Sequence, residues 1–346
     1  MIDQQYPQWP YQSGKNYPCN GPFQLKMNQP HQGYQLIKNP LYWESNKLKL
    51  DQVILTTMNP AQALDAFQKK EVDWVGNPFG AWQASYNIGK KNQILTFPNT
   101  WVIWNVYNVT VPPFNHRKIR QAFSCATQRS PIAQQSFMPL DPAYSIFLPH
   151  NREKNSGLFP QYDRELAVQL FHEGLHELGI PPESLPPLSI VFLETGIQAH
   201  IAHCLKEQFE DCFKISCVLE SLPWSALFNR MTKGHFQMGL ACWNSWVNDP
   251  IYAFKVFKYK NNKLNFSQWE HSQFQHLMDF SEQEITPFQR SQCLHQAEQL
   301  LSEETPITPL FFQSSQALIN EELHVVYRSP SGPFNAGRSF YTLKNS

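Results

Sequence analysis

The sequence predicts a two-lobed α/β protein. Short apolar strands alternate with amphipathic helices along most of its 346 residues, which is typical of layered α/β domains. A chain of this length usually forms two or three domains. The pattern changes near residues 105–114 and returns to strands near 312–320. We therefore expect the chain to leave a first lobe, build a second and come back, with a hinge and a cleft between the lobes.

The first lobe is expected to contain a hairpin and a strand–helix–strand unit. Two alternating segments flank a turn and predict the hairpin. A β-branched run, a helix opened by proline and a short apolar run follow, and this spacing predicts a βαβ unit with parallel strands. The expected elements are, in order, strands Gly21–Lys26 and Tyr34–Lys38, strand Gln52–Thr57, a helix over Pro60–Lys69 and strand Val72–Val75.

The second lobe is expected to combine helices with scattered strands. A second βαβ unit lies near its middle, and a long helix precedes the return of the chain. The expected elements are strand Trp101–Tyr107, helices His116–Ala126 and Asp163–Leu178, strand Ser189–Phe192, a helix near 196–210, strand Lys214–Val218, a helix near 223–232, strand Gln237–Leu240, a helix over 286–304, and strands Pro309–Phe312 and Ala317–Ile319. Cys125 falls in an apolar helical stretch and is expected in the core.

Composition and charge exclude several classes of protein. Lys plus Arg and Asp plus Glu are 28 each, so the net charge is zero, whereas a nucleic-acid partner would favour a basic excess. Aromatic residues make up 14% and charged residues only 16%. This balance suits a groove for apolar or peptide-like ligands, but a large core is the favoured explanation before any motif is considered. The seven cysteines show no CxxC spacing, so a metal or redox motif is not indicated.

Several segments together resemble the oligopeptide/dipeptide family of extracytoplasmic solute-binding proteins, the binding components of ABC peptide importers. No single segment is specific, and their order and spacing over residues 20–346 carry the resemblance. The matching segments are Gly21–Leu25, Lys38–Trp43, Glu71–Val75, Arg117–Ala126, Trp243–Pro250 and Pro306–Phe312.

The resemblance implies a two-lobed, class II periplasmic-binding-protein-like fold with part of the first lobe missing. Residues 1–19 are expected to be an irregular lead-in, 20–107 the remainder of domain I, 108–312 a domain III-like ligand-binding lobe and 313–346 a return to domain I. Because the family's first strands and second domain have no counterpart here, the chain resembles a truncated member or half of a split gene. An inactive fragment is a further expectation.

The resemblance also implies a function in peptide binding without catalysis. Hinge closure around the ligand is the expected mechanism. No catalytic residue, metal or cofactor is expected. The expected partners are a peptide, an ABC transporter permease and a separately encoded N-terminal half, with no nucleic acid. A different ligand of the family, such as a dipeptide, nickel complex or haem, is the alternative. The periplasm is the implied compartment; the first residues lack a signal-peptide pattern, so cytoplasmic retention is the other expectation.

The ligand-binding residues implied by the resemblance lie on one helix and one loop. They are Trp224, Trp243, Asn244, Ser245 and Trp246. Trp246 stands where an oligopeptide binder has the Asp that pairs with the peptide's α-ammonium, and an indole offers a cation–π contact instead. Asp249 is the other carboxylate in reach, but an Asp followed by Pro is typical of a helix N-cap, and we expect that role. Core packing is the alternative for the tryptophans.

One motif predicts a competing function. His172, Glu173 and His176 match the H-E-x-x-H pattern of zinc-dependent hydrolases, in which two histidines one helical turn apart bind the metal. The pattern is short, no third ligand is evident downstream, and a chance match on a solvated helix is the favoured interpretation. A solvated helix face is likewise expected for His200 and His203.

Overall fold

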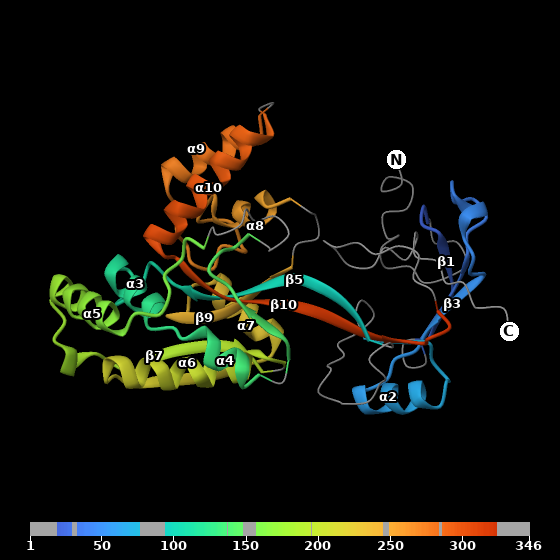
Figure 1. The fold of residues 1–346 in the computed structure, drawn as a ribbon, viewed down its shortest axis with the longest axis horizontal. Helices are drawn as coiled ribbons and strands as arrows, with labels where there is room; N and C mark the ends of the chain where they lie inside the picture. Colours follow the sequence, from blue (N-terminus) through green and yellow to red (C-terminus); the bar gives the residue numbers. More distant parts are fainter. Residues whose placement is uncertain are drawn as a thin grey trace. The chain divides into compact units, whose positions relative to one another are not determined.

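The computed structural model describes residues 19–29, 33–76, 94–136, 138–147, 157–194, 196–244, 249–283 and 286–323. The chain divides into two compact units. Unit 1 comprises Met1–Phe97 with Ser315–Ser346, and unit 2 comprises Pro98–Ser314. Strand β5 (Ile94–Tyr107) carries the chain from unit 1 into unit 2, and strand β10 (Ile307–Ile319) carries it back (Figure 1).

Unit 1 contains a three-stranded antiparallel sheet of β1 (Phe23–Gln29), β2 (Gly33–Lys38) and β3 (Gln52–Leu55). The predicted hairpin is confirmed by the pairing of β1 with β2. Helix α2 (Pro60–Gln68) follows, with Asn59 accepting a hydrogen bond from the Gln62 N–H as its N-cap.

The predicted parallel βαβ unit in this lobe is wrong. Strand β3 pairs with β2, whereas β4 (Trp74–Gly76) pairs antiparallel with β10, in a different sheet. The order strand–helix–strand is correct, but β4 takes its partner from about 240 residues further along the chain, at Ala317 to Ile319. A local pattern of apolar residues does not reveal such a partner.

Asn39 connects the two ends of the β1–β2 hairpin through hydrogen bonds of its side chain. Its side chain is 1% exposed. Its Nδ2 donates to the carbonyls of Gly21 and Cys19 at 2.8 and 3.3 Å, and its Oδ1 accepts from the Leu41 N–H and from Gln24, each at 3.0 Å. The segment Lys38–Trp43, which carried part of the resemblance, therefore has a structural role here.

Unit 2 is built on a mixed sheet. Its strands run in the order β10, β5, β9 (Met238–Asn244), β7 (Leu188–Leu193), β8 (Cys217–Leu222). Strands β7 and β8 are parallel and joined by α6 (Gln198–Phe213), so the second predicted βαβ unit is confirmed. Strand β9 pairs antiparallel with β5, and the short β6 (Leu140–Pro142) pairs with β10.

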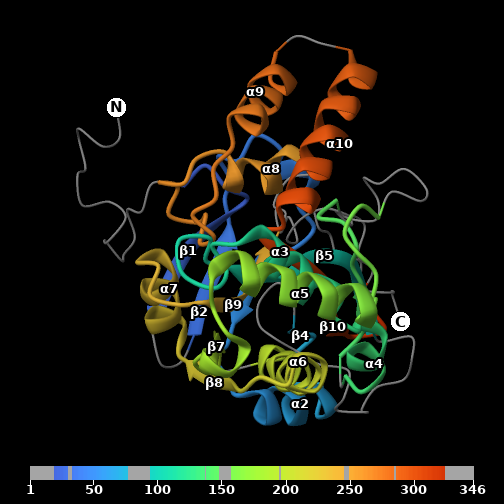
Figure 2. The same ribbon diagram turned by 90° about the vertical axis from the view of Figure 1, so that its left-hand side faces the viewer.

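Helices surround this sheet, and the last two long ones form an antiparallel hairpin (Figure 2). The predicted helices are present, a short helix follows Asp249 and Pro250 as α8, and α4 and α9 were not predicted. The helices are α3 (Arg117–Cys125), α4 (Arg129–Gln134), α5 (Arg164–Leu178), α7 (Trp224–Thr232), α8 (Ile251–Phe254), α9 (Ser272–Ser281) and α10 (Pro287–Glu304), with 3-10 turns at Ser45–Lys47, Pro182–Ser184 and Lys255–Phe257.

Both faces of the unit 2 sheet are buried. Along β5, Ile103 and Tyr107 enter one apolar cluster, whereas Val102 and Trp104 enter another. Alternate residues of a strand point to opposite faces, so a strand covered on both sides reads as the continuous apolar run seen here. Cys125 is 2% exposed in the first cluster, as predicted. In the described parts of the chain, no helix combines the length and apolar character of a membrane span.

Candidate functional site

The end of strand β9 carries two of the predicted ligand-binding residues, Trp243 and Asn244. Pairing with Val102 and Trp101 of β5 fixes their positions. The Trp243 ring packs against Tyr252, with centroids 5.2 Å apart and planes at 47°. The Trp243 Nε1 and the Asn244 Oδ1 are both buried, and neither has a hydrogen-bond partner among the residues that the structure describes.

These two atoms are unusual because buried polar groups are nearly always hydrogen-bonded. A buried donor or acceptor without a partner costs about 1–3 kcal/mol. An indole N–H requires an acceptor, and an amide oxygen requires a donor. A peptide group supplies one of each, a carbonyl and an N–H. Consecutive strand residues face opposite sides of the sheet, so Trp243 and Asn244 would contact different peptide groups.

Ser245 and Trp246, the next two predicted residues, lie outside the described residues. Their roles remain predictions.

Asp249 is engaged by other groups of the protein. Its Oδ1 and Oδ2 lie 2.8 and 2.9 Å from Nη2 of Arg290, and Oδ1 also accepts the N–H of Ile251 at 3.1 Å. The predicted N-cap assignment is wrong, because the N-cap is Pro250 and α8 begins at Ile251; Asp249 precedes the cap and accepts the N–H of the first helical residue. The ion pair was not predicted. Asp249 and Arg290 are 41 residues apart in sequence, and no local pattern links them.

Trp224 is the first residue of α7 and is 62% exposed. This exposure excludes the core-packing interpretation for Trp224. Its ring packs on Phe228 at 5.6 Å, and Phe228 meets Phe266 edge to face at 5.9 Å. An exposed aromatic side chain backed by two others provides a surface for apolar ligand groups.

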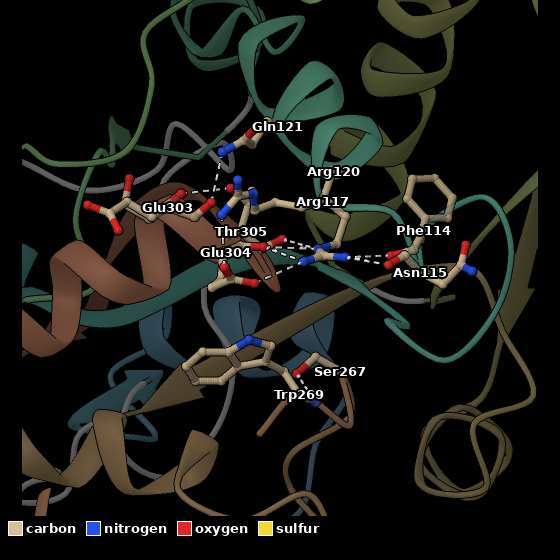
Figure 3. A network of polar contacts seen from close by, with 11 residues as sticks. Phe114, Asn115, Arg117, Arg120, Gln121, Ser267, Trp269, Glu303, Glu304 and Thr305 are labelled. Carbon is tan, nitrogen blue, oxygen red and sulfur yellow. Dashed lines mark hydrogen bonds and ion pairs between the residues drawn. The ribbon is translucent and has the colours of Figure 1, made fainter. Parts of the chain in front are cut away.

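Arg120 fixes the C-terminal end of α10, the helix that carries Arg290 (Figure 3). Its guanidinium donates to the carbonyls of Glu304 and Thr305 at the end of α10, and to that of Phe114 before α3. The last carbonyls of a helix lack partners within the helix, so a buried arginine satisfies them and complements the helix dipole. The exposed Arg117 adds an ion pair to Glu304 at 3.2 Å.

The H-E-x-x-H segment lies on α5, where its residues have structural partners. His172 and His176 are exposed. Glu173 accepts from Lys118 at 2.7 Å and from Gln169 at 2.8 Å, and these hydrogen bonds, together with the charge of Lys118, hold the pKa of Glu173 below its usual value. Within the described ranges, no group of three or more His, Cys, Asp or Glu side chains is placed to hold a metal ion. The helix is only partly solvated, because Phe171, Gly174 and Leu175 are buried.

His200 also has a structural contact rather than a fully solvated face. Its Nε2 lies 3.1 Å from the carbonyl oxygen of Ile132 in α4. This contact ties α6 to α4.

Comparison with known proteins identifies the family. The model of bacterial extracellular solute-binding proteins, family 5 (middle), matches residues 4–265. The chain belongs to this family. Bacillus subtilis (strain 168) oligopeptide-binding protein OppA is 26% identical over 332 residues, covering 94% of this chain and 61% of the relative. The dipeptide-binding protein DppE of the same organism is 22% identical, with 96% and 61% covered.

Solved structures show the same fold. An oligopeptide-binding protein of Borrelia burgdorferi has a TM-score of 0.78 at 21% identity, covering 99% of this chain and 68% of that one. Haemophilus influenzae OppA, in complex with the peptide RPPGFSPFR, has a TM-score of 0.74 at 18% identity, with 99% and 68% covered. The predicted two-lobed periplasmic-binding-protein fold is therefore confirmed. The chain spans 61% of the length of the two curated relatives above.

Proposed function

We propose that this chain binds peptides as the substrate-binding component of an ABC importer. Family membership sets the class of function. The observation that carries the proposal for this chain is the pair of unpartnered buried atoms, Trp243 Nε1 and Asn244 Oδ1, at the end of β9. Peptide main chains offer the missing acceptor and donor without regard to side-chain identity, which suits a transporter of many peptides.

The proposed site has an apolar and a polar part. Trp224 and Trp243 contact the ligand's side chains, while Asn244 and the Trp243 indole bond its main chain. Ser245 and Trp246 belong to the site as the family resemblance implies. No bond is made or broken in this mechanism, so affinity depends on burial and hydrogen bonds alone.

The partners and compartment follow from the family and are part of the proposal. The permease of an ABC transporter would receive the peptide, and binding would take place outside the cytoplasm.

Tryptophan fluorescence of the full chain tests the proposal. We expect mixtures of short peptides to change the emission and to saturate. Trp243→Phe keeps an aromatic ring against Tyr252 but removes the indole N–H, so the affinity should fall by about tenfold, as for one lost hydrogen bond. Leu166→Ala, on α5, is the control and should bind as the wild type does. An unaltered peptide affinity in Trp243→Phe would show that the indole N–H does not bind the ligand.

A further inference from the structure

Two arginines, Arg120 and Arg129, are buried in unit 2 at 3% and 1% exposure, but their partners differ. Arg120 donates to main-chain carbonyls and lies 3.7 Å from the Glu304 carboxylate. Arg129 donates from Nε to the Pro309 carbonyl at 2.8 Å and from Nη1 to the Pro160 carbonyl at 3.3 Å. Among the described residues, its Nη2 has no hydrogen-bond partner and no carboxylate forms an ion pair with it, although the Tyr144 side chain, through its charge and a hydrogen bond to Arg129, raises the pKa of the guanidinium.

Arg129 is therefore a buried positive charge with no carboxylate paired to it among the described residues. The Tyr144 ring lies 4.5 Å from the Arg129 guanidinium carbon, and this cation–π contact and the two carbonyls offset part of the cost. Burial lowers the pKa of Arg129 to about 10, which still leaves it charged at neutral pH. A buried charge normally requires a counter-charge as well as hydrogen bonds.

A second unpartnered group lies on the same face of the sheet. Asn105 is 1% exposed, and neither atom of its amide has a hydrogen bond. Because Asn105 and Tyr107 are two residues apart on β5, they point to the same side. The Tyr107 hydroxyl is 2.9 Å from that of Thr308, and Arg129 bonds the carbonyl of Pro309, the next residue of β10.

Asn105 and Tyr107 therefore share one face of β5, and Arg129 bonds β10, the strand next to β5 in the sheet. Burial raises the pKa of Tyr107 to about 12, while the side chains of Thr308 and Asn105 and the charge of Arg129 act to lower it.

We propose that Arg129 Nη2 and Asn105 Nδ2 hold a small monovalent anion, with chloride as the natural occupant, in the interior of unit 2. An anion supplies both the missing acceptor and the missing negative charge. A water molecule would satisfy the N–H groups but leave the charge of Arg129 uncompensated. Sulfate and phosphate carry a larger charge and volume than one guanidinium in a packed core accommodates.

Thermal unfolding of the full chain at constant ionic strength tests the site. Replacing sodium gluconate by sodium chloride should raise the midpoint of the wild type by about 2–4 °C, because a ligand bound only to the folded state stabilises it. Arg129→Met should abolish the chloride-dependent rise. Arg120→Met, which removes the arginine that has a carboxylate nearby, should keep it.

A crystallographic measurement on the wild type covers the case in which Arg129→Met does not fold. Crystals grown in sodium bromide should show an anomalous peak within about 3.5 Å of Arg129 Nη2 and Asn105 Nδ2, at the distance of a charge-assisted contact. A wild type whose midpoint is the same in chloride and gluconate would contradict the proposal. So would bromide crystals without this peak.

Discussion

The partners of Asp249 determine which role this side chain has. Arg290 and the N–H of Ile251 occupy its carboxylate, so it joins the start of α8 to the α9–α10 hairpin. An ammonium group of a ligand would have to compete with Arg290 for it. Asp249 is thus a poor candidate for recognising the N-terminus of a peptide.

Acetylated peptides test this reasoning. We expect a peptide and its N-acetylated form to bind the chain with affinities within about threefold, because the loss of a charged hydrogen bond would cost tenfold or more. Asp249→Asn should leave this ratio unchanged. Calorimetric titration of both peptides against both proteins provides the measurement. Discrimination of tenfold or more that disappears in Asp249→Asn would assign the ammonium to Asp249.

A surface carboxylate provides a test of pH dependence. Hydrogen bonds from Arg164 and Lys214 lower the pKa of Asp211 to about 2, below the value of roughly 3.9 expected in the unfolded chain. The ionised side chain therefore stabilises the fold above about pH 4, and this contribution is lost as the pH falls towards 2. Urea midpoints should show Asp211→Asn slightly less stable than the wild type at pH 6, with a difference that shrinks as the pH falls through about 2. A constant difference across this range would contradict the account.

Residue types at the site could be predicted from the sequence, but their partners could not. Trp224 does begin α7, as the resemblance implied, whereas Trp243, expected on a loop, lies in strand β9. The Asp249–Arg290 pair, the unpartnered indole and the Arg129 site depend on contacts between distant segments, which leave no local signal.

Gly174 determines how closely helices α3 and α5 approach. A Cβ at this position would lie 2.8 Å from Cδ1 and 2.9 Å from Cγ1 of the fully buried Ile119. The glycine in the H-E-x-x-H segment is thus explained by helix packing.

The prediction from local pattern was wrong around α2. The strand–helix–strand order there predicted parallel strands, but the structure places β3 and β4 in separate sheets.

Gly174→Ala should destabilise the protein by about 1–2 kcal/mol. Overpacking costs roughly 1–3 kcal/mol, and the gain in helix propensity of about 1 kcal/mol offsets only part of it. His172→Ala, on the exposed side of α5, is the matched control and should change neither stability nor metal content. Urea denaturation and elemental analysis measure both. Stoichiometric zinc that disappears in His172→Ala would restore the hydrolase interpretation.

The contacts of Arg120 between α3 and α10 provide a second test at the level of helices and strands. Arg120→Met leaves helix-end carbonyls and the Glu304 carboxylate without a buried donor, so a loss of about 2–4 kcal/mol is expected. Arg117→Ala, whose side chain is 56% exposed, should cost less than about 1 kcal/mol. Equal effects in denaturant titrations would mean that burial does not distinguish these two arginines.

The two units differ in the size of their cores. Unit 2 contains both large apolar clusters, with side chains such as Phe123, Phe209 and Phe254 fully buried. The described part of unit 1 has small clusters around Leu64 and Leu95. Burial of apolar surface is the main source of stability, so unit 2 should unfold last.

Limited proteolysis tests this difference. A broad-specificity protease should leave a resistant fragment close to residues 98–314, because exposed and thinly packed segments are cut first. Mass spectrometry of the fragments identifies the boundaries. A resistant N-terminal fragment with cuts throughout 98–314 would reverse the assignment.

Calorimetric titration of the full chain with short peptides tests the central claim most directly, with equimolar mixtures of the corresponding free amino acids as the control. We predict saturable binding of the peptides with a Kd below about 100 μM, corresponding to roughly 5.5 kcal/mol, and no saturable heat with the amino acids, because they lack the peptide groups that Trp243 and Asn244 are proposed to bond. Equal binding of peptides and free amino acids, or binding of neither, would contradict the account.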